Sequence, residues 1–214
     1  NIWIGTSNSV YKISIGKDNE ILKTENLNSN PYFQNNKLSL ARYVYADPLH
    51  DYIWIGADSE GLFRVKNNPN LSINQLKINQ YTNDKSNTKS ISSNFVTSIL
   101  RLPNESLWVG TESGGICKVL ESNTEPKFIN YTEKNGLSNN VVKSILYDDN
   151  NNLWISTNIG LNEFNTQKNE FRKFNESDGL AFEDFWFAAN QIENGTMVLS
   201  GLDGFIYFNP NEIT

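Results

Sequence analysis

The sequence contains one cysteine and one histidine, Cys117 and His50, among 214 residues. A single cysteine cannot form a disulfide within the chain, and its position in an apolar stretch indicates a small buried residue rather than a reactive thiol. A single histidine cannot supply a multi-histidine metal site. We therefore expect neither a metal ion nor another cofactor.

Basic residues and long apolar runs are also scarce. The formal net charge of −6 and the isoelectric point near 4.9 leave no basic stripe to neutralise phosphates, which excludes nucleic acid as an expected partner. No apolar run is long enough to span a bilayer. Helical periodicity is absent, whereas aromatic residues reach 12%. This combination favours an all-β protein with many turns.

One short phrase recurs along the chain. Its pattern is an apolar residue, an aromatic residue, an apolar residue and then small residues, and its second positions are Trp3, Trp54, Trp108, Trp154 and, in altered form, Val198. The successive spacings are 51, 54, 46 and 44 residues, a period typical of repeat architectures. Each phrase suits a strand buried on both faces, so we expect these positions to pack between sheets. Gly56 and Gly110, which follow two of the tryptophans, should allow a neighbouring sheet to approach closely.

A second strand with alternating apolar positions follows each phrase after a polar turn, and further strands precede and follow this pair. Four short antiparallel strands per period of roughly 45 residues are the signature of a β-propeller blade. The sequence thus predicts an all-β β-propeller fragment of about 4.5 four-stranded blades and about eighteen strands. The predicted units are a partial blade at residues 1–30, full blades at about 38–82, 94–132 and 140–175, and a partial blade at 185–209.

Specific motifs mark a family resemblance. The runs Asn135-Gly136-Leu137-Ser138, Leu153-Trp154-Ile155 and Asp178-Gly179-Leu180 resemble the two-component regulator propeller repeat. Residues 201–210 resemble the last such repeat before an immunoglobulin-like Y_Y_Y domain. The resemblance covers essentially the whole chain and is clearest over residues 135–180.

The resemblance implies a role in sensing. Such repeats form seven-bladed propellers in the periplasmic, extracytoplasmic region of hybrid two-component histidine kinases, many of which respond to oligosaccharides. By this resemblance, the chain would be a non-enzymatic, ligand-sensing segment that binds an oligosaccharide or other small ligand. Its other partners would be the remaining blades and a Y_Y_Y domain of a homodimeric parent chain. No histidine of a kinase dimerisation helix is present, so phosphotransfer cannot reside in this chain.

Propellers mostly bind ligands on the face formed by the loops that lead into the inner strands and by the loops that join the second strand to the third. On that geometry the predicted ligand-binding residues are Asn94, Glu112, Asn139, Asn140, Asn158, Glu183, Asp184, Trp186 and Asp203, with Ser92, Ser93, Ser113, Ser138, Phe185 and Leu202 beside them. Trp186 lies outside the repeating tryptophan register and could stack on a sugar ring, although an aromatic residue near a strand start is more often packing. Both interpretations remain open.

Other functional classes find less support. The acidic stretch Asp148-Asp149-Asn150-Asn151-Asn152 lacks the glycine and the distal glutamate of a calcium-binding loop, which favours a hairpin turn. Glu183 and Asp184 are adjacent, so in a strand they would point to opposite faces, which is poor geometry for a glycosidase pair. A propeller lyase or glycoside hydrolase, and a purely structural or dimerisation segment, remain the alternatives.

The strand count carries one more expectation. The first predicted unit has no inner strand before Trp3, and the last has no outer strand after residue 208. Such an arrangement predicts an open arc whose end sheets expose apolar surface and favour self-association.

Overall fold

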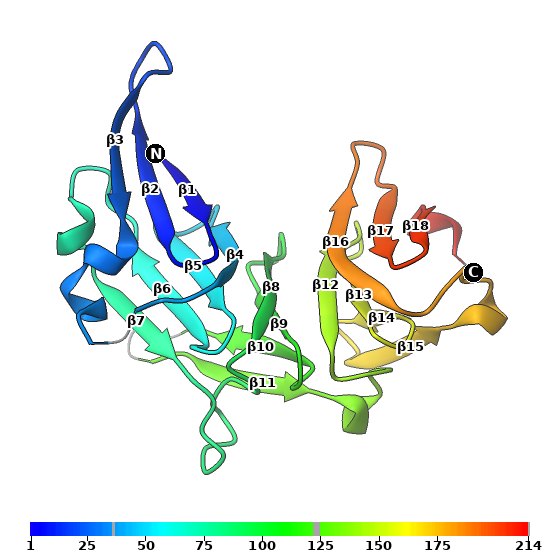
Figure 1. Ribbon diagram of the computed structural model, residues 1–214. Helices are drawn as coiled ribbons and strands as arrows, with labels where there is room; N and C mark the ends of the chain where they lie inside the picture. The colour runs from blue at the N-terminus through cyan, green and yellow to red at the C-terminus, as the bar shows by residue number, and fades with distance from the viewer. Residues whose placement is uncertain (36, 122–124, 214) are drawn as a thin grey trace.

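The computed structural model describes residues 1–35, 37–121 and 125–213. These residues form five antiparallel sheets that follow one another around an open arc (Figure 1). The predicted all-β propeller fragment is confirmed, with eighteen strands and only short 3-10 turns between them among the described residues. Within the described ranges, no helix is long and apolar enough to cross a membrane.

Each sheet is built from consecutive strands. The strands of the first three sheets are β1 (Ile2–Gly5), β2 (Val10–Ile15) and β3 (Ile21–Asn26); β4 (Ala41–Ala46), β5 (Tyr52–Ala57), β6 (Leu62–Lys66) and β7 (Ile78–Tyr81); and β8 (Val96–Arg101), β9 (Leu107–Thr111), β10 (Ile116–Leu120) and β11 (Lys127–Tyr131). The strands of the last two sheets are β12 (Val142–Tyr147), β13 (Leu153–Thr157), β14 (Leu161–Asn165) and β15 (Glu170–Phe174); and β16 (Phe185–Gln191), β17 (Met197–Gly201) and β18 (Gly204–Phe208). The 3-10 turns are η1 (Leu27–Ser29), η2 (Pro31–Phe33), η3 (Ile73–Gln75), η4 (Glu133–Asn135), η5 (Glu176–Asp178) and η6 (Pro210–Glu212).

The repeating tryptophans form the core between sheets, as the sequence predicts. Trp54, Trp108 and Trp154 are fully buried. Each indole N–H donates a hydrogen bond to a polar side chain near the preceding hairpin turn, which is Asp47, Ser106 or Asp148. Buried indoles need such a partner, since an unsatisfied N–H costs free energy.

Aromatic contacts join Trp108 and Trp154 to the following sheet. Trp108 lies 5.7 Å from Tyr131 of its own outer strand and 5.6 Å from Phe164 of the next sheet. Trp154 stacks on Phe174 at 5.5 Å and lies 4.9 Å from Phe208. The same residue type therefore fills the same space between successive sheets, which explains why the phrase recurs.

The inner strands β4, β8, β12 and β16 pack against one another in order around the centre of the arc (Figure 1). The predicted close approach at the glycines is confirmed. A Cβ on Gly56 would lie 2.5 Å from a methyl carbon of Val96, and one on Gly110 would lie 2.8 Å from a methyl carbon of Val142. Any side chain at these two positions would push the next inner strand away.

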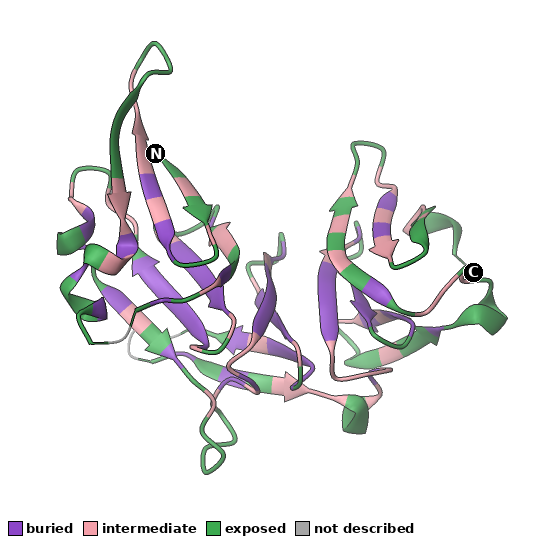
Figure 2. Ribbon diagram, viewed as in Figure 1, coloured by how far each residue is buried: buried purple, intermediate pink, exposed green. Residues whose placement is uncertain are grey.

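The first and last sheets have three strands each, whereas the three between them have four. Val198, in the last sheet, is only partly buried, and no following sheet covers it in the described part of the chain. Trp3, in the first sheet, is also partly buried and packs against the core of the second sheet. Phe205 and Tyr207 on β18 are 68% and 72% exposed, and Ile2 and Ile4 on β1 are exposed as well (Figure 2). Both end sheets thus present apolar surface, as expected from the strand count.

Replacement of Trp154 by alanine should lower the free energy of unfolding by about 3–5 kcal/mol, because it leaves a cavity between the fourth and fifth sheets. Chemical denaturation followed by circular dichroism measures the effect. Replacement of the half-exposed Trp186 by alanine is the matched control and should leave the unfolding midpoint close to that of the parent. Equal losses in the two variants would contradict the assignment of Trp154 to the core.

Candidate ligand-binding site

Two sets of loops meet on one face of the arc. The N–H groups of Gly61, Gly115 and Gly160, each just before a third strand, donate hydrogen bonds of 2.8–2.9 Å to backbone oxygens in the loop that leads into the next inner strand. The acceptors are the carbonyl groups of Asn94, Asn140 and Glu183. The three glycines have φ angles of 85°, 71° and 82°, which residues with a side chain rarely adopt. The loops are therefore fixed at the same height from sheet to sheet.

The side chains of Asn94, Asn140 and Glu183 are used inside these same loops. The side-chain oxygen of Asn94 accepts from the N–H of Asn83, that of Asn140 accepts from the N–H of Glu133, and that of Glu183 accepts from the N–H of Glu176. Asn139 accepts from the N–H of Val141 two residues further on. These four predicted ligand-binding residues stabilise the loops, because their side-chain oxygens accept hydrogen bonds from loop N–H groups that would otherwise be unpaired.

The remaining predicted residues are distributed around the face. The N–H groups of Glu112 and Asn158 bond to the carbonyl groups of Phe95 and Val141, beside the starts of inner strands. The Oε2 atom of Glu112 is buried and has no hydrogen-bond partner among the described residues. Asp184 is exposed next to the start of β16, and Asp203 is exposed in the turn between β17 and β18. The nine residues thus share a face without forming one cluster.

The inner strands β4, β8, β12 and β16 each contain a β-bulge near their start, and these bulges lie at the centre of this face. The strand register shifts between Ala41 and Tyr43 in β4, between Val96 and Ser98 in β8, and between Val142 and Ser144 in β12; in β16 the shift is longer and lies between Phe185 and Ala189. A bulge turns the side chain within it away from the regular alternation. The residues in these bulges include Arg42, Thr97, Lys143, Trp186 and Phe187.

Three sheets and the loop that leads into β8 contribute to one cluster of cationic and aromatic side chains. The guanidinium carbon of Arg42 lies 4.2 Å from the ring centroid of Phe95 and 5.6 Å from that of Phe187. The ammonium nitrogen of Lys143 lies 4.5 Å from the centroid of Phe187 and 5.5 Å from that of Trp186. Trp186 and Phe187 meet edge to face at 5.5 Å. We call Arg42, Phe95, Lys143, Trp186 and Phe187 the central cluster.

Trp186 is the one member of the central cluster that the sequence analysis identified. It is 50% exposed, so one part of the indole packs on Lys143 and Phe187 while the rest stays accessible. Arg42, Phe95, Lys143 and Phe187 were missed. A signal was present, because Arg42 and Lys143 each stand one residue after the first apolar residue of an inner strand, as Trp186 does.

A group of possible metal ligands lies at the opposite ends of the inner strands, where Asp47, His50 and Glu121 approach one another. Arg101 already occupies the space between the carboxylates, since its guanidinium group is 2.5 Å from Asp47 and 2.8 Å from Glu121. A cation held by both carboxylates disfavours a second one. Asp148 in the equivalent turn of the fourth sheet accepts from the N–H groups of Asn150 and Asn152, in accord with the predicted hairpin turn.

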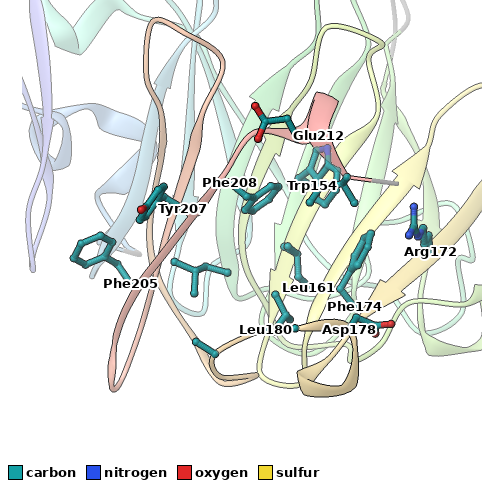
Figure 3. A pocket seen from close by; sticks show the side chains of 14 residues that line it. Trp154, Leu161, Arg172, Phe174, Asp178, Leu180, Phe205, Tyr207, Phe208 and Glu212 are labelled. Atoms are coloured by element: carbon teal, nitrogen blue, oxygen red, sulfur yellow. The ribbon is translucent and has the colours of Figure 1, made fainter.

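A cavity of about 600 Å³ lies elsewhere, between the fourth and fifth sheets (Figure 3). Trp154, Phe174 and Leu180 line one wall, and Phe208 of β18 lines another (Figure 3). In the fourth sheet, the outer strand places Phe171 against the preceding sheet, beside Tyr131 and Phe164. The fifth sheet has three strands, so no outer strand of this sheet fills the cavity. We therefore attribute this cavity to the three-stranded form of the fifth sheet.

Comparison with known proteins agrees with the fold. Residues 90–113 and 136–158 match the two component regulator propeller family. No curated protein matches the chain. The chain is thus a β-propeller segment, and two stretches of it are similar to the two component regulator propeller repeat.

Solved structures with the same fold include two extracellular domains of B. thetaiotaomicron proteins. One, BT4673, assigned as a one component or hybrid two component system, has a TM-score of 0.75 and 20% identity over 99% of this chain. Another, the hybrid two component system BT3049, has a TM-score of 0.50 and 22% identity over 98% of this chain. The chain spans only 28% and 32% of the two solved extracellular domains. Virginiamycin B lyase from Staphylococcus aureus is also similar, with a TM-score of 0.56 and 14% identity, over 97% of this chain and 66% of the enzyme. At these identities, the likeness shows the fold alone.

The buried pair of Asp47 and Arg101 predicts a dependence of stability on pH. Burial alone would raise the pKa of Asp47, but hydrogen bonds from Arg101, from the N–H of Leu49 and from Trp54 outweigh it and lower the pKa. Because the pKa is lower in the folded state, the pair stabilises the fold fully above the unfolded value of about 3.9, and this stabilisation is lost as the pH falls through the folded-state pKa.

The variant Asp47→Asn should therefore be less stable at pH 7 by about 3–5 kcal/mol, because it leaves the Arg101 charge buried without its main partner. It should also lose less stability than the parent between about pH 4 and pH 2. Thermal melts over that range measure both effects. The exposed Asp149→Asn variant should keep the parent's profile, and a parallel acid dependence in Asp47→Asn would contradict the assignment.

Proposed function

We propose that this chain is the ligand-sensing propeller segment of the extracytoplasmic, periplasmic region of a hybrid two component sensor. The matches to two component regulator propeller repeats support this assignment, as do structural neighbours that are extracellular domains. On this proposal the segment forms part of a larger propeller ring, and a Y_Y_Y domain and kinase domains elsewhere in a homodimeric parent protein transmit the signal. The segment itself would bind a ligand without converting it.

The observation that carries the binding function is the half-exposed indole of Trp186 at the centre of the loop face. Trp54, Trp108 and Trp154 are buried at repeating positions, whereas Trp186 lies within a bulge of β16 and rests on Lys143 and Phe187. An aromatic ring fixed from below and open above is suited to stack on the apolar face of a sugar. Asp184, two residues earlier and exposed, could accept hydrogen bonds from sugar hydroxyl groups. The proposed ligand is accordingly an oligosaccharide.

An enzymatic function is the alternative, because one structural neighbour is a lyase. The adjacent carboxylates Glu183 and Asp184 were judged a poor glycosidase pair from the sequence, and one oxygen of Glu183 accepts a hydrogen bond from the N–H of Glu176. Incubation of the protein with a panel of polysaccharides, followed by assays for new reducing ends and unsaturated products, tests this alternative. Product that accumulates over many turnovers would replace the binding proposal with an enzymatic one.

The Trp186→Ala variant should weaken oligosaccharide binding by about tenfold or more, because a central tryptophan typically dominates the free energy of a small interface. Isothermal titration calorimetry with a panel of oligosaccharides measures the affinity, and a thermal melt measures folding. Tyr207→Ala is the matched control, since Tyr207 is an aromatic residue 72% exposed on β18 and outside the central cluster. If the two variants bind equally well, Trp186 is not in the site.

A further inference from the structure

Lys143 carries a charge that the fold does not pair. Its side chain is only 7% exposed, yet no hydrogen bond or ion pair links its ammonium group to another residue in the described part of the chain. Its contacts are with the faces of Trp186 and Phe187. Burying a charged group is costly unless it is paired, and cation–π contacts offset only part of this cost, at about 2 kcal/mol or somewhat more in a desolvated site.

The ammonium group of Lys143 nevertheless remains reachable. Some polar atoms without a hydrogen-bond partner are fully buried, such as the hydroxyl oxygen of Thr97 and Oε2 of Glu112. Nζ of Lys143 also lacks a partner among the described residues, but it does not belong to this fully buried group. The three N–H donors of the ammonium group are therefore available to an incoming acceptor. The aromatic rings on either side fix the position of the nitrogen while leaving those donors unused.

Arg42 brings a second cation to the same ring. Its Nε donates to Asp58 at 2.5 Å, and its guanidinium carbon lies over Phe95 and beside Phe187. Arg42 and Lys143 thus flank Phe187 from two different sheets, and Asp58 is the one carboxylate paired with either of them among the described residues. With Asp58 counted, these three side chains carry one net positive charge in a chain whose net charge is −6.

The fold itself does not require a basic residue in these bulges. The equivalent bulge in β8 holds Thr97, and that in β16 holds Trp186 and Phe187. A neutral residue therefore satisfies the same backbone position. The two cations are thus better explained by what they bind than by how the strand is formed.

We propose that the ligand of this face carries an anionic group, a carboxylate or a sulfate, bound by Lys143 and Arg42 while a sugar ring stacks on Trp186. The inference rests on the proposed binding function and narrows its ligand to acidic oligosaccharides. An anion here would gain charge-assisted hydrogen bonds from the ammonium group and from the guanidinium N–H groups that Asp58 leaves open. The partly shielded position over three aromatic rings strengthens these bonds relative to bulk water.

Titrations with small probes test the proposal directly. Glucuronate, glucose 6-sulfate and glucose are added to the 214-residue chain at millimolar concentration, and binding is followed by nuclear magnetic resonance of the tryptophan indole N–H groups. Glucuronate or the sulfated sugar should shift the Trp186 signal and bind about tenfold more tightly than glucose, and this preference should shrink at high salt. The two acidic probes distinguish a carboxylate from a sulfate ligand.

The variants Lys143→Met and Arg42→Gln should each abolish most of the preference for the acidic probe and leave the affinity for glucose unchanged. Lys143→Arg keeps the charge and should keep the preference, which separates binding from folding. Lys118→Met is the matched control, because Lys118 makes the same kind of contact, 5.6 Å from the ring centroid of Trp108, outside the central cluster.

The outcomes separate the two proposals. Equal binding of glucose and glucuronate at Trp186 would overturn the anionic ligand and leave the sensing function in place. Binding of acidic probes that survives Lys143→Met and Arg42→Gln would also overturn it. If none of the probes perturbs Trp186, both the anionic ligand and the binding role of this face are wrong.

Discussion

The contact of one tryptophan with the aromatic residues of the following sheet is the interaction on which the rest of the fold depends. A single four-stranded sheet cannot bury both of its faces, so each sheet needs a neighbour. Trp108 shows how this need is met, because its ring touches Tyr131 in its own sheet and Phe164 in the next. That contact keeps neighbouring sheets side by side, so that glycines can let the inner strands approach and glycine N–H groups can hold the loops at one height.

Much of this arrangement was predictable from the sequence. The recurrence of one phrase at nearly constant spacing identifies the strands, and the burial of Trp54, Trp108 and Trp154 confirms their predicted role. Trp186 was separable from them for the same reason, since it falls outside the register. The position of a residue within a repeat thus predicts its burial, because equivalent positions pack between sheets in the same way.

The composition of the site was less predictable. Asn94, Asn140 and Glu183 were expected to face a ligand, but at least one oxygen of each side chain satisfies a backbone N–H of its own loop. A sequence does not show which loop N–H groups lack a partner. Arg42 and Lys143 were missed because their importance depends on bulges that turn them toward a ring on another sheet. Which side chains from different sheets come into contact depends on how the sheets are arranged in space.

The hydrogen bonds from Gly61, Gly115 and Gly160 have a consequence for how a signal could travel. Each bond ties the third-strand turn of one sheet to the loop that starts the next inner strand, and none of them reaches beyond the nearest neighbour. These bonds would therefore couple a displacement at the central cluster first to the adjacent sheet, and to more distant sheets only through the sheets in between. In a series connection of this kind, the response at either end of the segment depends on every contact between neighbouring sheets.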